Sequence, residues 1–305
     1  MTELRIAVGP DHSESTDEAV RRGGGQPVDA DAAADGLVWL SPWDTDGLRQ
    51  AMRVTGARWV QLSSAGVEVI AAAGLLSPAQ TWTCAKGAFA EPVAEHALML
   101  ALAGLRMLPQ RVEARSWGPQ GGTSLYDERV TILGGGGITA SLLRLLAPFR
   151  VTATVVRRSA DPVQGAARTV PTERLAEALA DAQVVFLALA LTPQTERIIG
   201  SAELAAMRPD SWLVNVARGR VVDTEALVAA LDTGTIGGAA LDVTEPEPLP
   251  DGHPLWSQPR CIITPHTADT PEMVARPLAL RIQDNVARFA AGQPLVGVID
   301  PMAGY

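Results

Sequence analysis

The sequence predicts an α/β protein built of two doubly wound parallel-sheet domains. Three observations predict this class: the length of the chain, the regular alternation of short apolar runs with amphipathic stretches, and a glycine-rich turn near the middle. The 305 residues suffice for two domains of roughly 100 to 200 residues, each with its own core. Strands that alternate with helices pair in parallel, because each crossover helix brings the chain back to the same end of the sheet.

Short apolar runs mark the expected strands, and apolar residues at helical spacing mark the segments between them. Thr172 and Asp223 are good N-cap residues for two of these helices. A single long helix is expected over 91–115, with Pro92 near its start, where the missing N–H costs nothing. The expected strands are 4–8, 36–40, 59–62, 130–133, 151–156, 184–189, 213–216 and 261–264.

The charge and composition argue against several classes of partner. A formal net charge of -9 and a pI near 5.0 disfavour nucleic acid, because binding to its phosphate backbone needs clustered Lys and Arg. No apolar stretch approaches the ~20 residues that span a bilayer, and the N-terminus lacks the cleavage site of a signal peptide. We therefore expect a cytoplasmic protein without a membrane partner. Cys84 and Cys261 match no metal-ligand spacing and are expected to be free buried thiols, so no metal site is predicted.

A strand, a glycine turn and a helix start follow one another at 130–140, which is the context that a dinucleotide-binding fingerprint requires. Gly134 permits the tight turn, and Gly136 lets backbone N–H groups approach a pyrophosphate at the helix N-terminus. Thr139 stands where the fingerprint has its third glycine, and we expect its side chain to push the helix slightly outward or to tilt it, without removing the phosphate site. The candidate cofactor-binding residues of this turn are Gly134, Gly136, Gly137 and Ile138.

The end of the next strand predicts which dinucleotide is bound. About 20 residues after the turn, this fold usually carries an acid that bonds the adenosine ribose, but here the strand ends in Arg157, Arg158 and Ser159. Guanidinium groups and a hydroxyl bind a 2'-phosphate, which a carboxylate would repel. NADP is therefore favoured and NAD stays possible. The alternative is that both arginines are merely solvated, with Asp161 as the next acid along the chain.

Three further polar motifs each begin where an apolar strand ends. Arg218 follows the first of these strands, Glu245 and Glu247 follow the second, and His266 follows the third. Because ligands bind at the carboxyl ends of parallel strands, Arg218, one of the two glutamates and His266 can converge on one crevice.

The order and wording of these motifs resemble the D-isomer-specific 2-hydroxyacid dehydrogenase family, and in particular its glyoxylate and hydroxypyruvate reductase branch. The resemblance runs from about residue 57 nearly to the C-terminus. It implies a Rossmann nucleotide-binding domain inserted in a flavodoxin-like substrate domain, a small 2-oxo or 2-hydroxy acid as substrate, and a homodimer. Further motifs that carry the resemblance are Ser64-Ala65-Gly66-Val67, Val93-Ala94-Glu95-His96 and Thr192-Pro193-Gln194-Thr195.

The resemblance also implies the domain boundaries. Residues 1–91 form the first part of the substrate (catalytic) domain, and 92–270 form the NAD(P)-binding domain. Residues 271–305 return to the substrate domain through an amphipathic helix over 274–290.

The roles that the resemblance implies divide between chemistry and binding. His266 is the acid that protonates the carbonyl oxygen and the base in the reverse direction, and Glu247 is its partner. Arg218 pairs with the substrate carboxylate and polarises the 2-oxo group. The implied substrate-binding residues are Ser64, Ala65 and Gly66, and the implied additional cofactor contacts are Thr192, Val216 and Asp242, the last through the nicotinamide carboxamide.

Other functions fit the sequence less well. A formate dehydrogenase of the same superfamily typically carries Gln in place of Glu247. The alternative of a different class is a non-catalytic, dinucleotide-sensing binding protein of the co-repressor kind on the same fold, and a degenerate enzyme is a third possibility, suggested by Gly137 and Thr139. His96 is expected to have an interdomain structural role, with substrate contact as the alternative.

Overall fold

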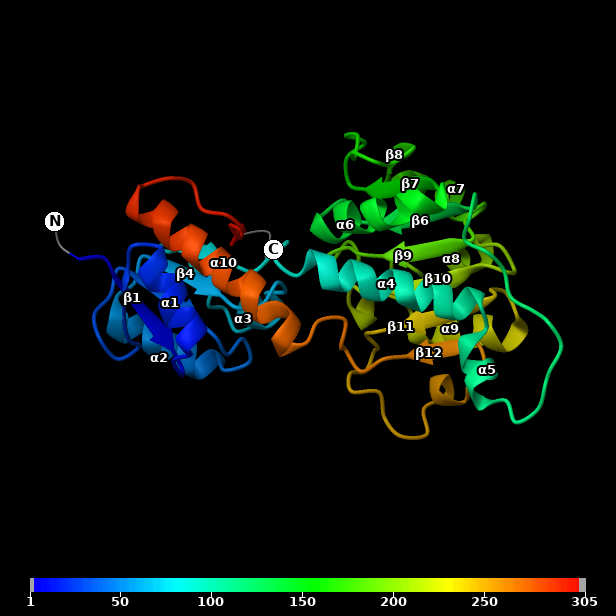
Figure 1. Cartoon of the computed structure of the whole chain (residues 1–305), viewed down its shortest axis with the longest axis horizontal. Helices are drawn as coiled ribbons and strands as arrows, with labels where there is room; N and C mark the ends of the chain where they lie inside the picture. Colours follow the sequence, from blue (N-terminus) through cyan, green and yellow to red (C-terminus); the bar gives the residue numbers. More distant parts are fainter. Residues whose placement is uncertain (1–2, 302–305) are drawn as a thin grey trace. The chain divides into compact units, whose positions relative to one another are not determined.

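The computed structural model describes residues 3–301, and its contacts divide the chain into two compact units (Figure 1). One unit, here the terminal unit, runs up to Phe89 and resumes at Thr270; the other, the central unit, is Ala90–Asp269. The boundaries expected at 91 and 270 differ from these by at most two residues. Each unit is built around one parallel sheet, which confirms the predicted fold class.

The terminal unit contains a five-stranded sheet in the order β2-β1-β3-β4-β5, with all pairs parallel. This is the flavodoxin-like strand order. The strands are β1 (Arg5–Gly9), β2 (Gln26–Asp29), β3 (Gly36–Trp39), β4 (Trp59–Leu62) and β5 (Thr81–Thr83).

Helices cover both faces of this sheet. On one face, α1 (Glu14–Arg22) packs against α10 (Pro271–Ala290), and their apolar residues bury the side chains of β1. On the other face, α2 (Thr45–Thr55) and α3 (Glu68–Ala72) bury the opposite side chains of the strands. The C-terminal helix therefore belongs to the same core as the first strand, although more than 240 residues separate them.

A buried polar network ties α10 to this sheet. Asn285 is fully buried, and its amide group donates to Gln61 Oε1 (2.8 Å) and to the carbonyl oxygen of Val296 (2.9 Å). The same Gln61 oxygen accepts the hydroxyl of Thr83 (2.8 Å), whose oxygen accepts the indole N–H of Trp59 (2.8 Å). Each buried polar group thus has a partner, as burial requires.

The central unit contains a seven-stranded sheet in the order β12-β11-β10-β9-β6-β7-β8, again with all pairs parallel. This is the doubly wound Rossmann order with one added strand, and the order reverses between β6 and β9. The strands are β6 (Arg129–Leu133), β7 (Thr152–Arg157), β8 (Arg168–Pro171), β9 (Val184–Leu187), β10 (Trp212–Asn215), β11 (Gly238–Leu241) and β12 (Cys261–Ile263).

Alternate residues of these strands face two separate cores. Ile132 and Phe186 pack with α4 (Ala90–Leu105) and α6 (Gly137–Leu146), which lie side by side in Figure 1. Leu133 and Leu187 face the opposite way. The helices on that side are α7 (Leu175–Leu179), α8 (Ser201–Ala206) and α9 (Thr224–Thr233), and the short 3-10 turns of the unit are η1 (Ala147–Phe149), η2 (Thr172–Arg174), η3 (Gly219–Val221) and η4 (Pro254–Ser257).

The long helix expected over 91–115 is wrong in its length. The chain leaves α4 at Leu105, and Met107 adopts a left-handed backbone with φ 54°. A second, short helix, α5 (Leu108–Glu113), then begins with Pro109 in its first turn. Proline is tolerated in a first turn and breaks a continuous helix, because it has no N–H to donate. Within residues 3–301, no helix combines the length and apolarity of a membrane crossing.

We predict that Asn285→Leu destabilises the terminal unit by about 1–3 kcal/mol, because it removes the amide donor of the Val296 carbonyl and one of the two donors to the buried Gln61 Oε1. Urea unfolding of the full chain, followed by far-UV circular dichroism, measures this change. Asp284→Asn, at the exposed neighbouring position, is the control and should change stability little. A leucine variant as stable as the parent would contradict the structural importance of the network.

Candidate active site

The register of the central sheet brings several strand ends into one row. Paired residues on neighbouring strands are Leu133 with Leu187, Leu187 with Asn215, Asn215 with Leu241, and Leu241 with Ile263. The residues that follow these positions therefore form one rim at the carboxyl edge of the sheet. They are Gly134, Ala188, Val216, Asp242 and Thr264.

Arg218 is held at this rim by the turn after β10. Asn215, which is buried, accepts the backbone N–H of Ala217 (3.0 Å) and donates to the carbonyl oxygen of Arg218 (3.0 Å). One guanidinium nitrogen of Arg218 donates back to the carbonyl of Ala217 (2.7 Å). A side chain on Gly219 would lie 1.8 Å from the carbonyl oxygen of Thr244. Glycine therefore lets the Arg218 turn pack directly on the loop that follows β11.

Asp242 organises the loop that carries His266. Its carboxyl group is buried, with 2% of the residue exposed. Oδ1 accepts the hydroxyl of Thr264 (2.6 Å) and the backbone N–H of Thr267 (3.0 Å), and Oδ2 accepts the backbone N–H of Ala268 (3.0 Å). His96 of α4 places its Nε2 3.2 Å from Oδ1. The Asp242 carboxylate therefore accepts hydrogen bonds from residues before and after His266 in the sequence.

These contacts also set the charge of Asp242. Burial on its own raises the pKa, but the hydrogen bonds from His96, Thr264 and the loop amides outweigh burial and lower the pKa from 3.8 to about 2. The carboxylate is therefore ionised at neutral pH, and several hydrogen-bond donors stabilise its negative charge.

His266 sits in a strained turn beside Glu247. Its φ of 50° lies in the left-handed region, which costs a residue other than glycine of order 1 kcal/mol. Its backbone N–H lies 2.8 Å from the carbonyl oxygen of Asp242 and 3.0 Å from that of Thr264. The ring Nδ1 lies 2.6 Å from Glu247 Oε1, and 41% of the His266 side chain is exposed. The turn thus presents an accessible imidazole that is anchored through one nitrogen.

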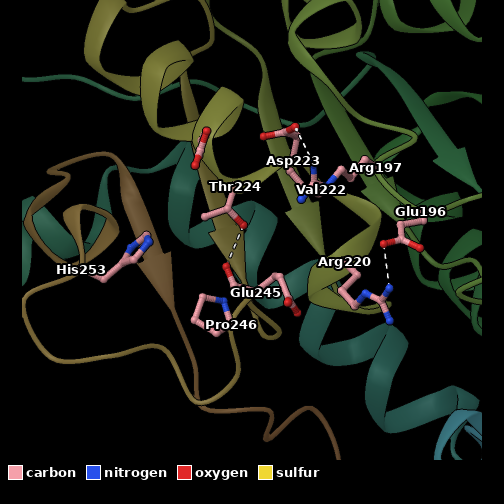
Figure 2. Close-up of a pocket in the computed structure, with 10 residues that line it drawn as sticks. Glu196, Arg197, Arg220, Val222, Asp223, Thr224, Glu245, Pro246 and His253 are labelled. Carbon is pink, nitrogen blue, oxygen red and sulfur yellow. Dashed lines mark hydrogen bonds and ion pairs between the residues drawn. The ribbon is translucent and has the colours of Figure 1, made fainter. Parts of the chain in front are cut away.

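Glu245, the alternative carboxylate, lies elsewhere. It lines a separate cavity of about 590 Å³, shown in Figure 2, where Arg220 and His253 are also found. The Glu245 charge raises the pKa of Arg220, after the larger effect of the hydrogen bond with Glu196. The structure therefore brings Glu247, and not Glu245, to the His266 ring.

The glycine turn between β6 and α6 fits a close-packed dinucleotide cradle. Gly134 has φ 109°, and a side chain there would lie 2.3 Å from the carbonyl oxygen of Ala188. A side chain on Gly135 would lie 3.0 Å from the Arg157 side chain, whereas a side chain on Gly136 would meet nothing within 4 Å. The turn is therefore crowded on the protein side and open above Gly136, where Gly137 begins the ten-residue helix α6.

Thr139, at the third fingerprint position, is accommodated by a hydrogen bond. It is fully buried, and its hydroxyl donates to the carbonyl oxygen of Gly134 (2.8 Å). The side chain thus fastens the first turn of α6 to the glycine turn, which supplies a partner for a buried hydroxyl that would otherwise be costly.

Two arginines and a nearby carboxylate lie at the end of β7. Arg157 is half-buried against the glycine turn, and Arg158 is exposed. Ser159 donates its hydroxyl to Asp161 (2.7 Å). The carboxylate of Asp161, the next acid along the chain, is therefore held at the end of β7.

The remaining predicted residues lie in loops or at strand ends. Thr192 is half-buried after β9, where its N–H donates to the hydroxyl of Thr195 (2.7 Å), and Val216 is buried. Ile138 lies in the first turn of α6. In the terminal unit, the Ser64 hydroxyl donates to the carbonyl of Gly66 (2.6 Å), with exposed Ala65 between them. The roles expected for these residues stay predictions.

Sequence reasoning missed Asp269, which follows His266 by three residues. It is half-buried, and burial raises the pKa of its carboxyl group, while the nearby charges of His266 and Arg218 oppose this shift. Its position in the His266 loop is the sequence signal that could have identified it. Within residues 3–301, no group of three or more His, Cys, Asp or Glu side chains could hold a metal ion.

Comparisons with known proteins establish the family. Residues 96–268 match the sequence model of "D-isomer specific 2-hydroxyacid dehydrogenase, NAD binding domain". An uncharacterized protein from the proB 3' region of Corynebacterium melassecola is 40% identical over 254 residues, which are 81% of this chain and 84% of that protein. This chain belongs to the D-isomer specific 2-hydroxyacid dehydrogenase family, which confirms the resemblance seen in the sequence.

Named relatives lie in the reductase branch. The human protein named glyoxylate reductase/hydroxypyruvate reductase is 33% identical over 217 residues, which cover 67% of this chain and 65% of the human protein. The match thus spans less than two thirds of the human reductase. A crystal structure of a D-isomer specific 2-hydroxyacid dehydrogenase from Xanthobacter autotrophicus Py2, in complex with NADPH and MES, is 27% identical, covers 99% of both chains and has a TM-score of 0.84.

We predict that Asp242→Asn destabilises the protein by roughly 2 kcal/mol at pH 7. The folded pKa of about 2 lies below the unfolded value of 3.8, so the stabilisation is present above pH 3.8 and is lost as the pH falls toward 2. Urea titrations at pH 7 and pH 3 should show the difference between variant and parent narrowing at the lower pH. Asp181→Asn is the control, because the side chain of Asp181 is 71% exposed. If the stability difference between Asp242→Asn and the parent is the same at both pH values, the lowered pKa of Asp242 is contradicted.

Proposed function

We propose that this protein is an NAD(P)-dependent oxidoreductase that interconverts a small 2-oxo acid, of the glyoxylate or hydroxypyruvate kind, and the matching D-2-hydroxy acid. The observation that carries the proposal is the 2.6 Å contact between His266 Nδ1 and Glu247 Oε1 at the sheet edge that also holds Arg218. Family membership, the name of the human relative and the NADPH complex of the Xanthobacter protein support the reaction class. The expected homodimer stays a prediction.

In the proposed reaction, the protein supplies the proton and the cofactor supplies the hydride. The nicotinamide cofactor, when bound, supplies a hydride to the carbonyl carbon. Reduction also needs one proton at the carbonyl oxygen, and His266 is the group that we assign to give it. Because Nδ1 faces Glu247, Nε2 is the nitrogen that gives the proton in reduction and takes it in oxidation.

Substrate binding is assigned to cationic and backbone groups. The planar guanidinium of Arg218 suits a carboxylate through paired hydrogen bonds and is charged at any physiological pH. It also draws electrons from the adjacent 2-oxo group, which eases hydride addition. Ser64, Ala65 and Gly66 stay predicted substrate-binding residues, through their backbone N–H groups.

Cofactor binding is assigned to the glycine turn and the end of β7. The open space above Gly136 and the start of α6 fit a pyrophosphate. The half-buried Arg157 beside this turn, with exposed Arg158 next to it, fits a 2'-phosphate, which favours NADP. The further contacts proposed for the cofactor are Gly134, Gly137, Ile138, Ser159, Thr192, Val216 and Asp242.

Substitution of His266 tests the proposed proton transfer. His266→Gln should lower kcat/KM for glyoxylate or hydroxypyruvate with NADPH by about 10²–10⁴-fold, the usual contribution of a general acid. Glu247→Gln should lower it less, and Glu245→Gln should leave it within about twofold. Steady-state assays of NADPH oxidation measure these rates, and fluorescence titration measures NADPH affinity, which should change little in any variant.

The results separate the proposed enzyme from the alternative. An active His266→Gln variant would contradict the assignment of the acid. Absence of turnover by the parent chain with glyoxylate, hydroxypyruvate and phenylpyruvate, despite measurable dinucleotide binding, would favour the sensing protein.

Substitutions at the end of β7 test the proposed choice of cofactor. Arg157→Ser should lower kcat/KM for NADPH about tenfold or more relative to NADH, because it removes a cation that binds the 2'-phosphate. Asp161→Asn should shift the ratio the opposite way, because it removes a carboxylate that repels this phosphate. Rates with both cofactors measure the ratio; a parent enzyme that works better with NADH would overturn the NADP assignment.

A further inference from the structure

His96 enters the base of the His266 loop from a different part of the fold. It lies on α4, on the face that packs toward the sheet, and 14% of its side chain is exposed. Its Nε2 lies 3.0 Å from Thr264 Oγ1 and 3.2 Å from Asp242 Oδ1. The reaction proposed above gives this histidine no task.

The hydrogen bonds fix which atoms carry protons. Asp242 is ionised, because its pKa is lowered to about 2, and its two oxygens accept the backbone N–H groups of Thr267 and Ala268, so the carboxylate has no proton to donate. The hydroxyl of Thr264 must therefore donate to Asp242 across their 2.6 Å contact. Since a hydroxyl has one proton, Thr264 Oγ1 can only accept from His96. His96 consequently carries a proton on Nε2, and this N–H is shared between Thr264 and Asp242.

The consequence reaches His266 through the backbone. Thr264 precedes His266 by two residues, and Thr267 and Ala268 follow it, so the hydrogen bonds of Asp242 fix the loop on both sides of His266. These hydrogen bonds stabilise the backbone of His266 at a φ of 50°, which is unfavourable for a residue other than glycine. Rotation of the Asp242 carboxylate would disturb all three of these contacts together.

We propose that His96 is a positioning residue for the proposed reaction: its Nε2–H orients the Asp242 carboxylate and Thr264 hydroxyl, which hold the His266 loop in its working conformation. Helix α4 and the His266 loop are thereby joined through one shared proton. The pKa of Asp242, lowered to about 2, is consistent with this donor. Asp269 is in electrostatic contact with Asp242, and the charges of His266 and Arg218 also act on Asp269.

The test uses variants that remove or retain the donor. His96→Leu removes the N–H, whereas the side-chain amide of His96→Gln can place an N–H near the same point. Thr264→Val removes the middle link without changing α4. His253→Gln, a histidine in the same unit outside this cluster, is the matched control.

Two measurements are made on the full chain. In the first, which does not depend on activity, acid unfolding followed by far-UV circular dichroism should occur at higher pH in His96→Leu and Thr264→Val. A folded pKa of Asp242 closer to 3.8 means that the stabilisation is lost earlier as the pH falls. In the second, kcat for a 2-oxo acid should fall about tenfold, and the acid limb of kcat/KM should move to higher pH.

The outcomes decide the proposal separately from the proposed function. Recovery of both properties in His96→Gln supports the shared proton. An equal defect in His96→Gln and His96→Leu would show that ring packing matters and would overturn it, as would wild-type behaviour of His96→Leu. If the parent chain has no turnover at all, the proposed function fails, and the acid-unfolding series still decides the role of His96.

Discussion

The candidate site depends on one buried negative charge. Asp242 stands where β11 ends, and its carboxylate is surrounded by donors from α4 and from the 264–268 loop. A buried carboxylate is costly unless its oxygens are satisfied, so the surrounding segments must adopt the conformation that satisfies them. His266 is accordingly held in a backbone conformation that its own sequence does not favour, with its imidazole facing Glu247. Stability and geometry at this edge are thus set by the same contacts.

The doubly wound sheet explains why the proposed groups are near one another. Parallel strands in register end in one row, so residues that directly follow different strands become neighbours at one rim. Gly134 and Asp242 are such residues, although 108 positions separate them. The sheet therefore brings a glycine turn suited to a phosphate and the base of an imidazole-bearing loop to one edge. This arrangement is what a reaction between a dinucleotide and a small acid requires.

Much of this organisation was predictable, and the misses have physical causes. Strands buried on both faces are continuous apolar runs, which is why the expected strand 36–40 matched β3 to within one residue. The short edge strands β2 and β8 have one neighbouring strand each and contain polar residues and proline, so their runs carry little apolar signal. The break at Met107 was signalled by Pro109, which the expected long helix did not take into account. The family resemblance ranked Glu247 above Glu245, but the side-chain directions that separate the two glutamates arise only in the fold.

The discontinuous terminal unit sets an order on folding during synthesis. The central unit is one uninterrupted stretch, so all of its strands are available once residue 269 has left the ribosome. The first sheet is made much earlier, yet one of its faces is covered by Ile282 and Val286 of α10. Until those residues emerge, Ile6 and Trp59 lack their apolar cover, and Gln61 lacks the amide of Asn285. Of the two sheets, the one made earlier is therefore completed later, and its apolar face stays uncovered until α10 has been made.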